Sequence, residues 1–358
     1  DAIKKYAKKY SQEHPNVKIK LTYIPYNEFT KQLTVQATSG DLPDIIMYGV
    51  NETQIYAKTG ILENINPQVK KWGEIDQYYK GLQKIHKLNG DFYGLPIQAN
   101  AMVLFYNKDL VSKPPKTWGD LRKISKKVTT DKTYAMAASA ANSQLGTASF
   151  IPFLWSSGAD VESLTSPSAI KALTLWKDMV DQGYMSKEIT NWDFQDVTNA
   201  FTSKRAAMMI DGPWEIPTIK EKAPDLNWGI APIPKDKKSV TVAGGESLGI
   251  GKGQNVEEAW KFIKWLSDPK RILGFLKTSG NLPARKDLAK NDYFQTDPQR
   301  KELVKIIETT QGYGWGTHHN EFNLAIANAL QKAVSGVNSP KQALKEASQK
   351  VKAALKND

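Results

Sequence analysis

The sequence contains no cysteine among its 358 residues. This absence excludes disulfide bonds, thiolate metal sites and cysteine nucleophiles. The chain also has no run of about 18 apolar residues, the length that a membrane-spanning helix requires. Residues 1–5 lack the apolar core of a signal peptide, so we expect any targeting segment to be absent from this chain.

Histidine is scarce, with only four residues, and none of them has the HExxH spacing or a comparable ligand spacing. The sequence also has no G-x-S-x-G motif, the usual sign of a serine hydrolase of the α/β type. The glycines of residues 249–253 lack the GxxxxGK[ST] spacing of a phosphate loop. We therefore predict no metal, no cofactor and no catalytic residue.

The chain carries 49 lysine and arginine residues against 37 aspartate and glutamate residues, a net charge of +12. Such an excess can indicate a nucleic-acid partner. However, the lysines are spread over faces whose other side is apolar, as with Lys4, Lys5, Lys8 and Lys9, which is typical of a solvated surface. We predict no nucleic-acid partner, and a polyanion-binding adhesin remains an alternative that would show salt-sensitive binding.

The length exceeds the roughly 250–300 residues at which a single hydrophobic core stops growing, so we expect two lobes. Residues 1–13 have the apolar spacing of a helix, residues 17–23 alternate like a strand, a second helix ends at Gly40, and 45–47 is an apolar strand. This alternation predicts a parallel sheet with crossover helices, an α/β fold. Because the chain opens on a helix, we expect the first strand of that sheet to be missing before Asp1.

One stretch points to a binding site. Residues 206–210 read as a short buried strand, and Asp211-Gly212-Pro213 after it form a turn, because glycine allows positive φ and proline cannot continue a strand ladder. The turn carries Trp214, and a large apolar side chain on such a turn commonly lines a cleft. Burial of Trp214 in the core is the alternative.

Other aromatic and amide side chains also follow strands or lie in glycine-rich loops. They are Tyr48, Asn51, Gln98, Asn100, Trp155, Trp192, Trp214, Tyr313 and Trp315. Flat apolar faces beside amides suit an uncharged carbohydrate, whose rings carry C–H faces and a rim of hydroxyls. A glycoside hydrolase is the enzymatic alternative, with its two carboxylates drawn from Asp193, Asp211, Glu215 and Glu246.

The chain resembles the extracellular sugar-binding proteins of ABC importers, most closely the maltose/maltodextrin-binding type. Matching segments follow one another in order along the full length. They are residues 39–46, 56–57, 60–62, 106–110, 114–118, 212–214, 259–262 and 322–351.

This resemblance implies two α/β lobes, each a mostly parallel sheet flanked by helices, with a sugar cleft between them that closes by a hinge motion. It implies an N-terminal lobe of residues 1–100 plus 248–288 and a C-terminal lobe of 105–243 plus 300–358. The expected hinge segments are near residues 100–105, 243–248 and 288–300.

The resemblance also transfers site residues one by one. Tyr48 stands at the position of a stacking tryptophan and Asn51 at that of a sugar-binding aspartate. Glu52 stands where maltodextrin binders have arginine, and Asn100 where they have glutamate. Trp214 matches a stacking tryptophan directly. Exchanging acids for amides alters which hydroxyls can be bound, so the resemblance does not identify maltose as the ligand.

Asn323 stands where maltodextrin binders have another stacking tryptophan, so Tyr313 or Trp315 from the neighbouring loop would replace that platform. We expect Gln98 and Glu246 to bind hydroxyls and Trp155 to shape the cleft wall. The full predicted ligand-binding set is Trp214, Tyr48, Asn51, Asn100, Gln98, Glu52, Glu246, Gly245, Trp155, Tyr313, Trp315 and Asn323.

These observations predict a monomeric, non-enzymatic protein that binds an oligosaccharide outside the cell and delivers it to an ABC permease. We expect a cell-surface lipoprotein, with a periplasmic protein as the alternative.

Overall fold

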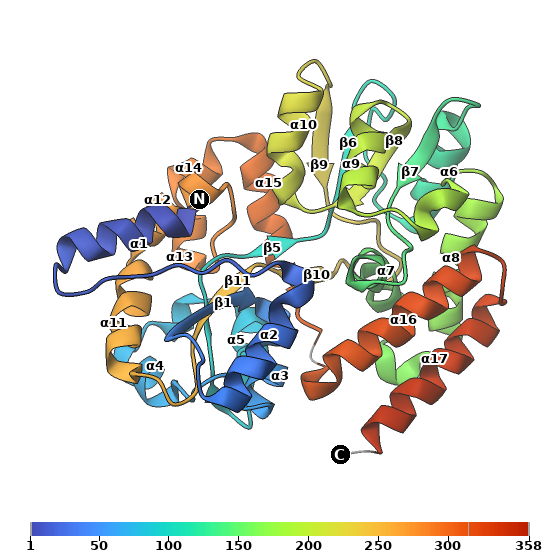
Figure 1. The fold of residues 1–358 in the computed structure, drawn as a ribbon. Coiled ribbons are helices and arrows are strands. Elements are labelled where there is room, and N and C mark those ends of the chain that lie inside the picture. Colours follow the sequence, from blue (N-terminus) through green and yellow to red (C-terminus); the bar gives the residue numbers. More distant parts are fainter. Residues whose placement is uncertain (1, 314, 357–358) are drawn as a thin grey trace. The chain divides into compact units, whose positions relative to one another are not determined.

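The computed structural model describes residues 2–313 and 315–356. The chain divides into two compact units, each built from separate stretches (Figure 1). Unit 1 comprises Asp1–Asn100, Ala243–Thr296 and Gly312–Thr317, and unit 2 comprises Ala101–Val242, Asp297–Gln311 and His318–Asp358. No helix in the described ranges is long and apolar enough to cross a membrane.

The first half of unit 1 alternates helices with short strands. Its elements are α1 (Ala2–Glu13), α2 (Tyr26–Ser39), β1 (Ile45–Gly49), η1 (Val50–Glu52), α3 (Thr53–Lys58), α4 (Asn66–Trp72), η2 (Ile75–Gln77), α5 (Lys80–Ile85), β2 (Lys87–Leu88), β3 (Asp91–Phe92) and β4 (Leu95–Pro96). After the chain returns to this unit, it forms β11 (Glu246–Ile250), α11 (Val256–Leu266), α12 (Pro269–Ser279), α13 (Lys286–Ala289) and α14 (Asp292–Gln295).

The central sheet of unit 1 has the strand order β1-β11-β4, and β2 and β3 form a separate hairpin. β11 runs antiparallel to both neighbours, from the pair Ile45↔Ile250 to the pair Gly49↔Glu246 on the β1 side. α2 packs against this sheet through Leu33 and ends as predicted at Gly40, which adopts the left-handed conformation with φ of 76°.

Two predictions about this sheet are wrong. Residues 17–23 form no strand, and Leu21 and Tyr23 are exposed. A strand needs a neighbouring strand to bond its backbone groups. Among the described strands, β1 pairs only with β11 and not with residues 17–23. The sheet is also not parallel, because the strand that pairs with β1 enters from a distant part of the chain and runs antiparallel to it.

Unit 2 is larger and richer in helices. Its elements are β6 (Val103–Asn107), α6 (Trp118–Val128), β7 (Tyr134–Ala137), α7 (Gln144–Ser156), η3 (Val161–Ser163), α8 (Pro167–Asp181), η4 (Lys187–Thr190), α9 (Phe194–Thr202), β8 (Ala206–Asp211), η5 (Pro213–Glu215), α10 (Ile216–Lys222), β9 (Trp228–Ala231), α15 (Pro298–Ile307), β12 (Thr310–Gln311), α16 (His319–Val334) and α17 (Pro340–Leu355). The short strands β5 (Asn100–Ala101) and β10 (Thr241–Gly244) contain the points at which the chain passes from one unit to the other.

The main sheet of unit 2 has the order β7-β8-β6-β9. Only the β7–β8 pair is parallel, so the predicted mostly parallel sheet is also wrong here. β8 is buried along its whole length, as predicted from its apolar residues. α16 and α17 lie side by side against α8 (Figure 1).

Two predicted helix starts are confirmed. The Thr117 side chain accepts a hydrogen bond of 3.1 Å from the Asp120 amide, and the Asp120 carboxylate accepts one from the Thr117 amide, a capping box. The Asn255 side chain likewise accepts a bond of 3.2 Å from the Glu258 amide at the start of α11.

Candidate functional site

In unit 1 the end of β1 and the residues after it are hydrogen-bonded to the turn between β10 and β11. Gly49 pairs with Glu246 across the ladder, and the Val50 amide donates a hydrogen bond of 3.1 Å to the Gly245 carbonyl. The Asn51 side-chain amide, Nδ2, donates a hydrogen bond of 3.0 Å to the Ala243 carbonyl. Residues 243–246 are therefore held directly against the residues that follow β1.

The same turn is in close contact with residues 97–100. Gly245 has φ of 120°, and a Cβ on it would meet the carbonyl oxygen of Gln98, so only glycine fits. A Cβ on Gly244 would lie 3.5 Å from the Asn100 Cβ, and the Ile97 amide donates to the Glu246 carbonyl over 2.9 Å. Three segments that are far apart in sequence thus meet at one edge of the unit 1 sheet.

This edge carries three buried side-chain oxygens for which the described residues supply no hydrogen-bond partner: Asn51 Oδ1, Asn100 Oδ1 and Glu246 Oε2. Leaving a buried acceptor unpaired costs about 1–3 kcal/mol, so such groups are uncommon in proteins and need an explanation. A ligand that donates hydrogen bonds would satisfy them. We call these three residues the unit 1 polar cluster.

Glu246 differs from an ordinary surface glutamate in its protonation. Burial raises the pKa of its carboxyl to about 7. Near neutral pH the carboxyl therefore exists in both forms, and only the protonated form can donate a hydrogen bond.

Gln98 and Glu52 belong to the predicted set and lie beside the cluster. Gln98 is buried, and its Oε1 accepts a hydrogen bond of 2.8 Å from Asn281 Nδ2, so this oxygen already has a structural partner. The Glu52 carboxyl packs over Gly49, in the position that a Cβ there would occupy. Gly49 and Glu246 are a register pair, so their Cβ directions share one face of the sheet.

Tyr48 is a core residue in this structure. Its side chain is 3% exposed, its ring packs edge-on against Tyr56 with centroids 5.6 Å apart, and its hydroxyl accepts a 3.3 Å hydrogen bond from Thr53. A Cβ on Gly94 would collide with the hydroxyl of Tyr48. This burial favours a structural role for Tyr48 and gives no support to the predicted stacking role.

Tyr313 and Trp315 also belong to unit 1. Both are buried, and their ring centroids lie 4.4 Å apart at an angle of 44°. Gly312, which precedes them, lies so close to Ile85 that a Cβ would collide with it. Gly314 of the predicted aromatic loop lies outside the described residues.

In unit 2, Trp214 is held at the surface by its neighbours. It lies in η5 directly after β8, and its side chain is 37% exposed, so the core alternative does not apply. Its ring covers Gly212, where a Cβ would collide with the indole. Phe194 of α9 supports the indole edge-on, with centroids 5.3 Å apart at 85°. The result is a supported flat apolar surface beside the end of a buried strand.

Behind this surface lies Asp211, which is fully buried. Burial, and to a lesser degree the nearby Glu215 carboxylate, raises the pKa of Asp211 well above its ordinary value. Its Oδ1 accepts a hydrogen bond of 2.7 Å from the Gly212 amide, which helps to fix the turn that carries Trp214.

The remaining predicted residues of unit 2 have structural contacts. Trp155 of α7 is 1% exposed, and its Nε1 donates to Asp160 over 3.0 Å, which favours a core role over a cleft wall. Asn323 of α16 is buried, and its backbone carbonyl accepts a 2.9 Å bond from Thr147. Its Oδ1 is buried and has no partner among residues 2–313 and 315–356.

Nothing in the geometry favours the hydrolase alternative. Asp193 caps α9, where its Oδ1 accepts a 3.0 Å bond from the Asp196 amide, and Asp211 is fully buried, with its Oδ1 bonded to the Gly212 amide. The part of the chain that the structure describes also contains no group of three or more histidine, aspartate or glutamate side chains that could hold a metal ion.

Sequence reasoning missed two contributors. Phe194 supports Trp214, and the Ala243 carbonyl orients Asn51. Neither carries a local signal, because the first contact links two elements and the second spans 192 positions.

Comparison with known proteins identifies the family. Residues 5–302 match the model of a family described as bacterial extracellular solute-binding protein. The multiple sugar-binding protein of Streptococcus mutans is 27% identical, and the match covers 92% of this chain and 82% of that protein. The maltooligosaccharide ABC transporter solute-binding lipoprotein of Streptococcus pneumoniae is 24% identical, with 99% and 86% covered.

A solved structure of the sugar-binding protein MalE from Xanthomonas citri has a TM-score of 0.89 to this chain at 22% identity, covering 99% of this chain and 94% of that one. This likeness confirms the predicted fold class, the two-lobed fold of periplasmic binding proteins. With the family model matching most of the sequence, the chain belongs to the bacterial extracellular solute-binding proteins.

Proposed function

We propose that this protein binds an oligosaccharide outside the cell and delivers it to the membrane permease of an ABC importer. The observation that carries the proposal is the unit 1 polar cluster, where Asn51, Asn100 and Glu246 present buried oxygens that find no partner in the described ranges. Sugar hydroxyls can donate hydrogen bonds and carry no charge. They are attached to adjacent carbons of the ring, so one sugar can satisfy several such acceptors at once.

Trp214 supports the same proposal from unit 2. Its flat, partly exposed ring can stack on the C–H face of a sugar, and Phe194 keeps the ring in place without covering it. As the resemblance implies, we propose that the protein closes on the bound sugar by a hinge motion. Closure needs only a higher affinity of the sugar for the closed arrangement than for an open one.

The relatives support the ligand class and the transport role. The Streptococcus mutans relative is named a multiple sugar-binding protein, and the Streptococcus pneumoniae relative is named a maltooligosaccharide ABC transporter solute-binding lipoprotein. From the word lipoprotein in the latter name we infer that this protein is anchored by lipid at the cell surface. We further propose that it acts as a monomer and without catalysis.

Thermal unfolding against a panel of mono- and oligosaccharides tests the proposal, with tryptophan fluorescence recorded in parallel. A ligand at 100 times its Kd adds about 2.7 kcal/mol to the free energy of unfolding, which raises the melting temperature measurably. A rise with one series of oligosaccharides supports the proposal and identifies the series. No rise with any saccharide of a broad panel contradicts it, as does release of shorter sugars by the purified protein.

A further inference from the structure

We propose that Asp211 holds a proton in the folded protein and that its neutral carboxyl is a positioning group for Trp214. Asp211 is the last residue of β8, and Trp214 follows it across the turn at Gly212 and Pro213. The inference deepens the proposed function. It rests on that function only where sugar affinity is concerned, because the proton itself can be tested without a sugar.

The Asp211 carboxyl is bonded to the turn that carries Trp214. Its Oδ1 accepts the 2.7 Å hydrogen bond from the Gly212 amide, and the Trp214 ring covers Gly212. The Gly212 carbonyl in turn accepts a 3.2 Å bond from the Glu215 amide, which closes the turn. A movement of the Asp211 carboxyl would therefore move the backbone against which the indole rests.

This carboxyl has too few donors around it to be ionised. It is fully buried, whereas an ionised carboxyl can accept hydrogen bonds at about four positions. Across the described ranges, its Oδ2 has no hydrogen-bond partner, and no cationic side chain forms an ion pair with it. A buried carboxylate without such partners loses its charge by taking up a proton.

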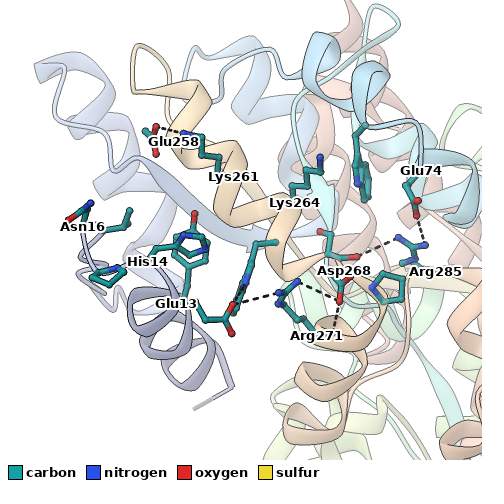
Figure 2. Close-up of a pocket in the computed structure, with 17 residues that line it drawn as sticks. Glu13, His14, Asn16, Glu74, Glu258, Lys261, Lys264, Asp268, Arg271 and Arg285 are labelled. Atoms are coloured by element: carbon teal, nitrogen blue, oxygen red, sulfur yellow. Dashed lines mark hydrogen bonds and ion pairs between the residues drawn. The ribbon is translucent and has the colours of Figure 1, made fainter.

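Elsewhere the chain pairs a buried charge. Arg285 of unit 1, whose side chain is 3% exposed, bonds the carboxylates of Glu74 and Asp287, both at 2.7 Å, and Figure 2 shows the bond to Glu74. Asp211 is at least as buried and has no such counterpart in the described part of the chain. The comparison favours the neutral form of Asp211.

The neighbouring groups also favour a proton. Burial raises the pKa of Asp211 most, and the Glu215 carboxylate raises it further. The bond from the Gly212 amide and the side chains of Trp214 and Thr198 act in the opposite direction without cancelling this rise. A proton on Oδ2 would also give a donor to Thr198, whose buried Oγ1 has no partner in the described ranges.

Few other titratable groups lie on the elements that contact β8. Among their described residues, β6 and β7 contribute only Tyr106 and Tyr134, both nearer the start of β8 than its end. α9 contributes only Asp196, which is exposed in the first turn of that helix. Changes with pH near the turn should therefore come from Asp211 and Glu215.

NMR of the whole protein with isotope-labelled tryptophan tests the proton without a sugar. The indole signal of Trp214, identified by its absence in Trp214→Phe, should shift with pH at a midpoint well above 3.8, the ordinary value for aspartate. Asp211→Asn should abolish this shift, because the amide keeps an acceptor for Gly212 and places a donor where the O–H was. Glu215→Gln should lower the midpoint, since it removes a charge that raises it.

Thermal unfolding gives a second test. Because the folded pKa is raised, the contribution of Asp211 to stability is fully present below pH 3.8 and is lost as the pH rises through the folded pKa. Asp211→Asn lacks this loss, so its melting temperature should rise relative to that of the unaltered protein between pH 5 and pH 8. Asp225→Asn is the matched control. It removes a carboxylate from the exposed turn between α10 and β9 and should keep the pH dependence of the unaltered protein.

The link to binding is measured by titrating both the unaltered protein and Asp211→Asn with the saccharide of the panel that raises the melting temperature most. The affinity of the unaltered protein should fall about fivefold relative to the variant as Asp211 ionises, the loss of part of one stacking contact. Comparison at each pH cancels the titration of Glu246, which both proteins share.

A Trp214 signal that does not shift, or that shifts equally in Asp211→Asn, would overturn the proposal. So would a melting temperature of Asp211→Asn that lies below that of the unaltered protein by the same amount at every pH. Equal affinities of the two proteins at every pH would overturn the positioning role. If no saccharide binds, the proposed function fails, and the NMR and unfolding results still decide whether Asp211 holds a proton beside Trp214.

Discussion

Asn51 and Ala243 are 192 positions apart in the chain, and the side-chain Nδ2 of the first donates a 3.0 Å hydrogen bond to the carbonyl of the second. Because the carbonyl accepts, this bond identifies which end of the amide is nitrogen. The other end, Oδ1, is buried, and no donor among the described residues forms a hydrogen bond to it. One side chain thus holds the turn at residues 243–246 and carries a buried oxygen that we propose accepts a hydrogen bond from the sugar.

Asn51→Ala should lose both roles. We expect sugar affinity to fall at least tenfold and the free energy of unfolding to fall by about 1 kcal/mol, the usual net value of one hydrogen bond. Titration calorimetry and urea unfolding measure the two effects.

Gln83→Ala is the control for Asn51→Ala. The Gln83 Nε2 also donates to backbone carbonyls, those of Ile75 and Tyr78, both at 3.0 Å, but in a part of unit 1 with no predicted ligand contact. It should lower stability by a similar amount and leave sugar affinity unchanged. Equal affinity of the Asn51→Ala variant and the unaltered protein would remove Asn51 from the site.

Glu246 makes stability depend on pH. Burial raises the pKa of its carboxyl to about 7, above its ordinary value of 4.5, so between these values the folded state binds more protons than the unfolded state. The contribution of Glu246 to the free energy of unfolding is therefore greatest below pH 4.5, and this contribution is lost as the pH rises to about 7. The loss should be about 1–3 kcal/mol.

Glu246→Gln should abolish that part of the pH dependence. Urea unfolding at pH 5 and pH 8 should give a smaller difference for the variant than for the unaltered protein, with Asp211 and the other titrating groups cancelling in the comparison. If the two differences are equal, the Glu246 carboxyl titrates as it would in water, and its place in a dry binding site is wrong.

Trp214→Ala should weaken sugar binding by about 1–3 kcal/mol, given the area that an indole covers, and should reduce the fluorescence change on binding. Stability should fall by less than for a fully buried indole, because the side chain is 37% exposed and loses only its packing on Gly212 and Phe194.

Trp155→Phe gives the opposite pattern and serves as the control for Trp214→Ala. The Trp155 indole is 1% exposed and bonds Asp160, so its loss should cost about 1–3 kcal/mol of stability. Affinity per folded molecule should stay the same. A sugar affinity that falls for Trp155→Phe and not for Trp214→Ala would reverse the two assignments.

The sequence was sufficient to predict local features. The buried strand ends at Asp211 and Trp214 is exposed soon after it, because Pro213 has a fixed φ and no amide to continue the strand ladder, irrespective of the rest of the fold. The caps at Thr117 and Asn255 were equally predictable, since their partners lie three residues away.

Long-range features could not be predicted in this way. The ladder between β1 and β11 joins segments about 200 residues apart, and its direction has no local signal. The side of β1 that Tyr48 faces depends on the same pairing, because successive side chains of a strand point to opposite faces. Apolar and polar side chains alternate along residues 17–23 as they do in a strand. This alternation does not supply a second strand to which the backbone could bond.

Gly245→Ala tests whether the backbone of the turn shapes the site. Its φ of 120° is strained for alanine, and the new Cβ would meet the Gln98 carbonyl, so the turn must move away from residues 98–100. We expect a loss of about 3 kcal/mol in stability together with weaker sugar binding, because Glu246 and Asn100 would separate. Gly253→Ala has φ of 80° and no atom within 4 Å of the added Cβ, so it should cost only the backbone strain and leave affinity intact. Comparison of the two by urea unfolding and calorimetry distinguishes strain from displacement: a Gly245→Ala protein that binds sugar normally would mean that the close approach to Gln98 does not set the geometry of the unit 1 polar cluster.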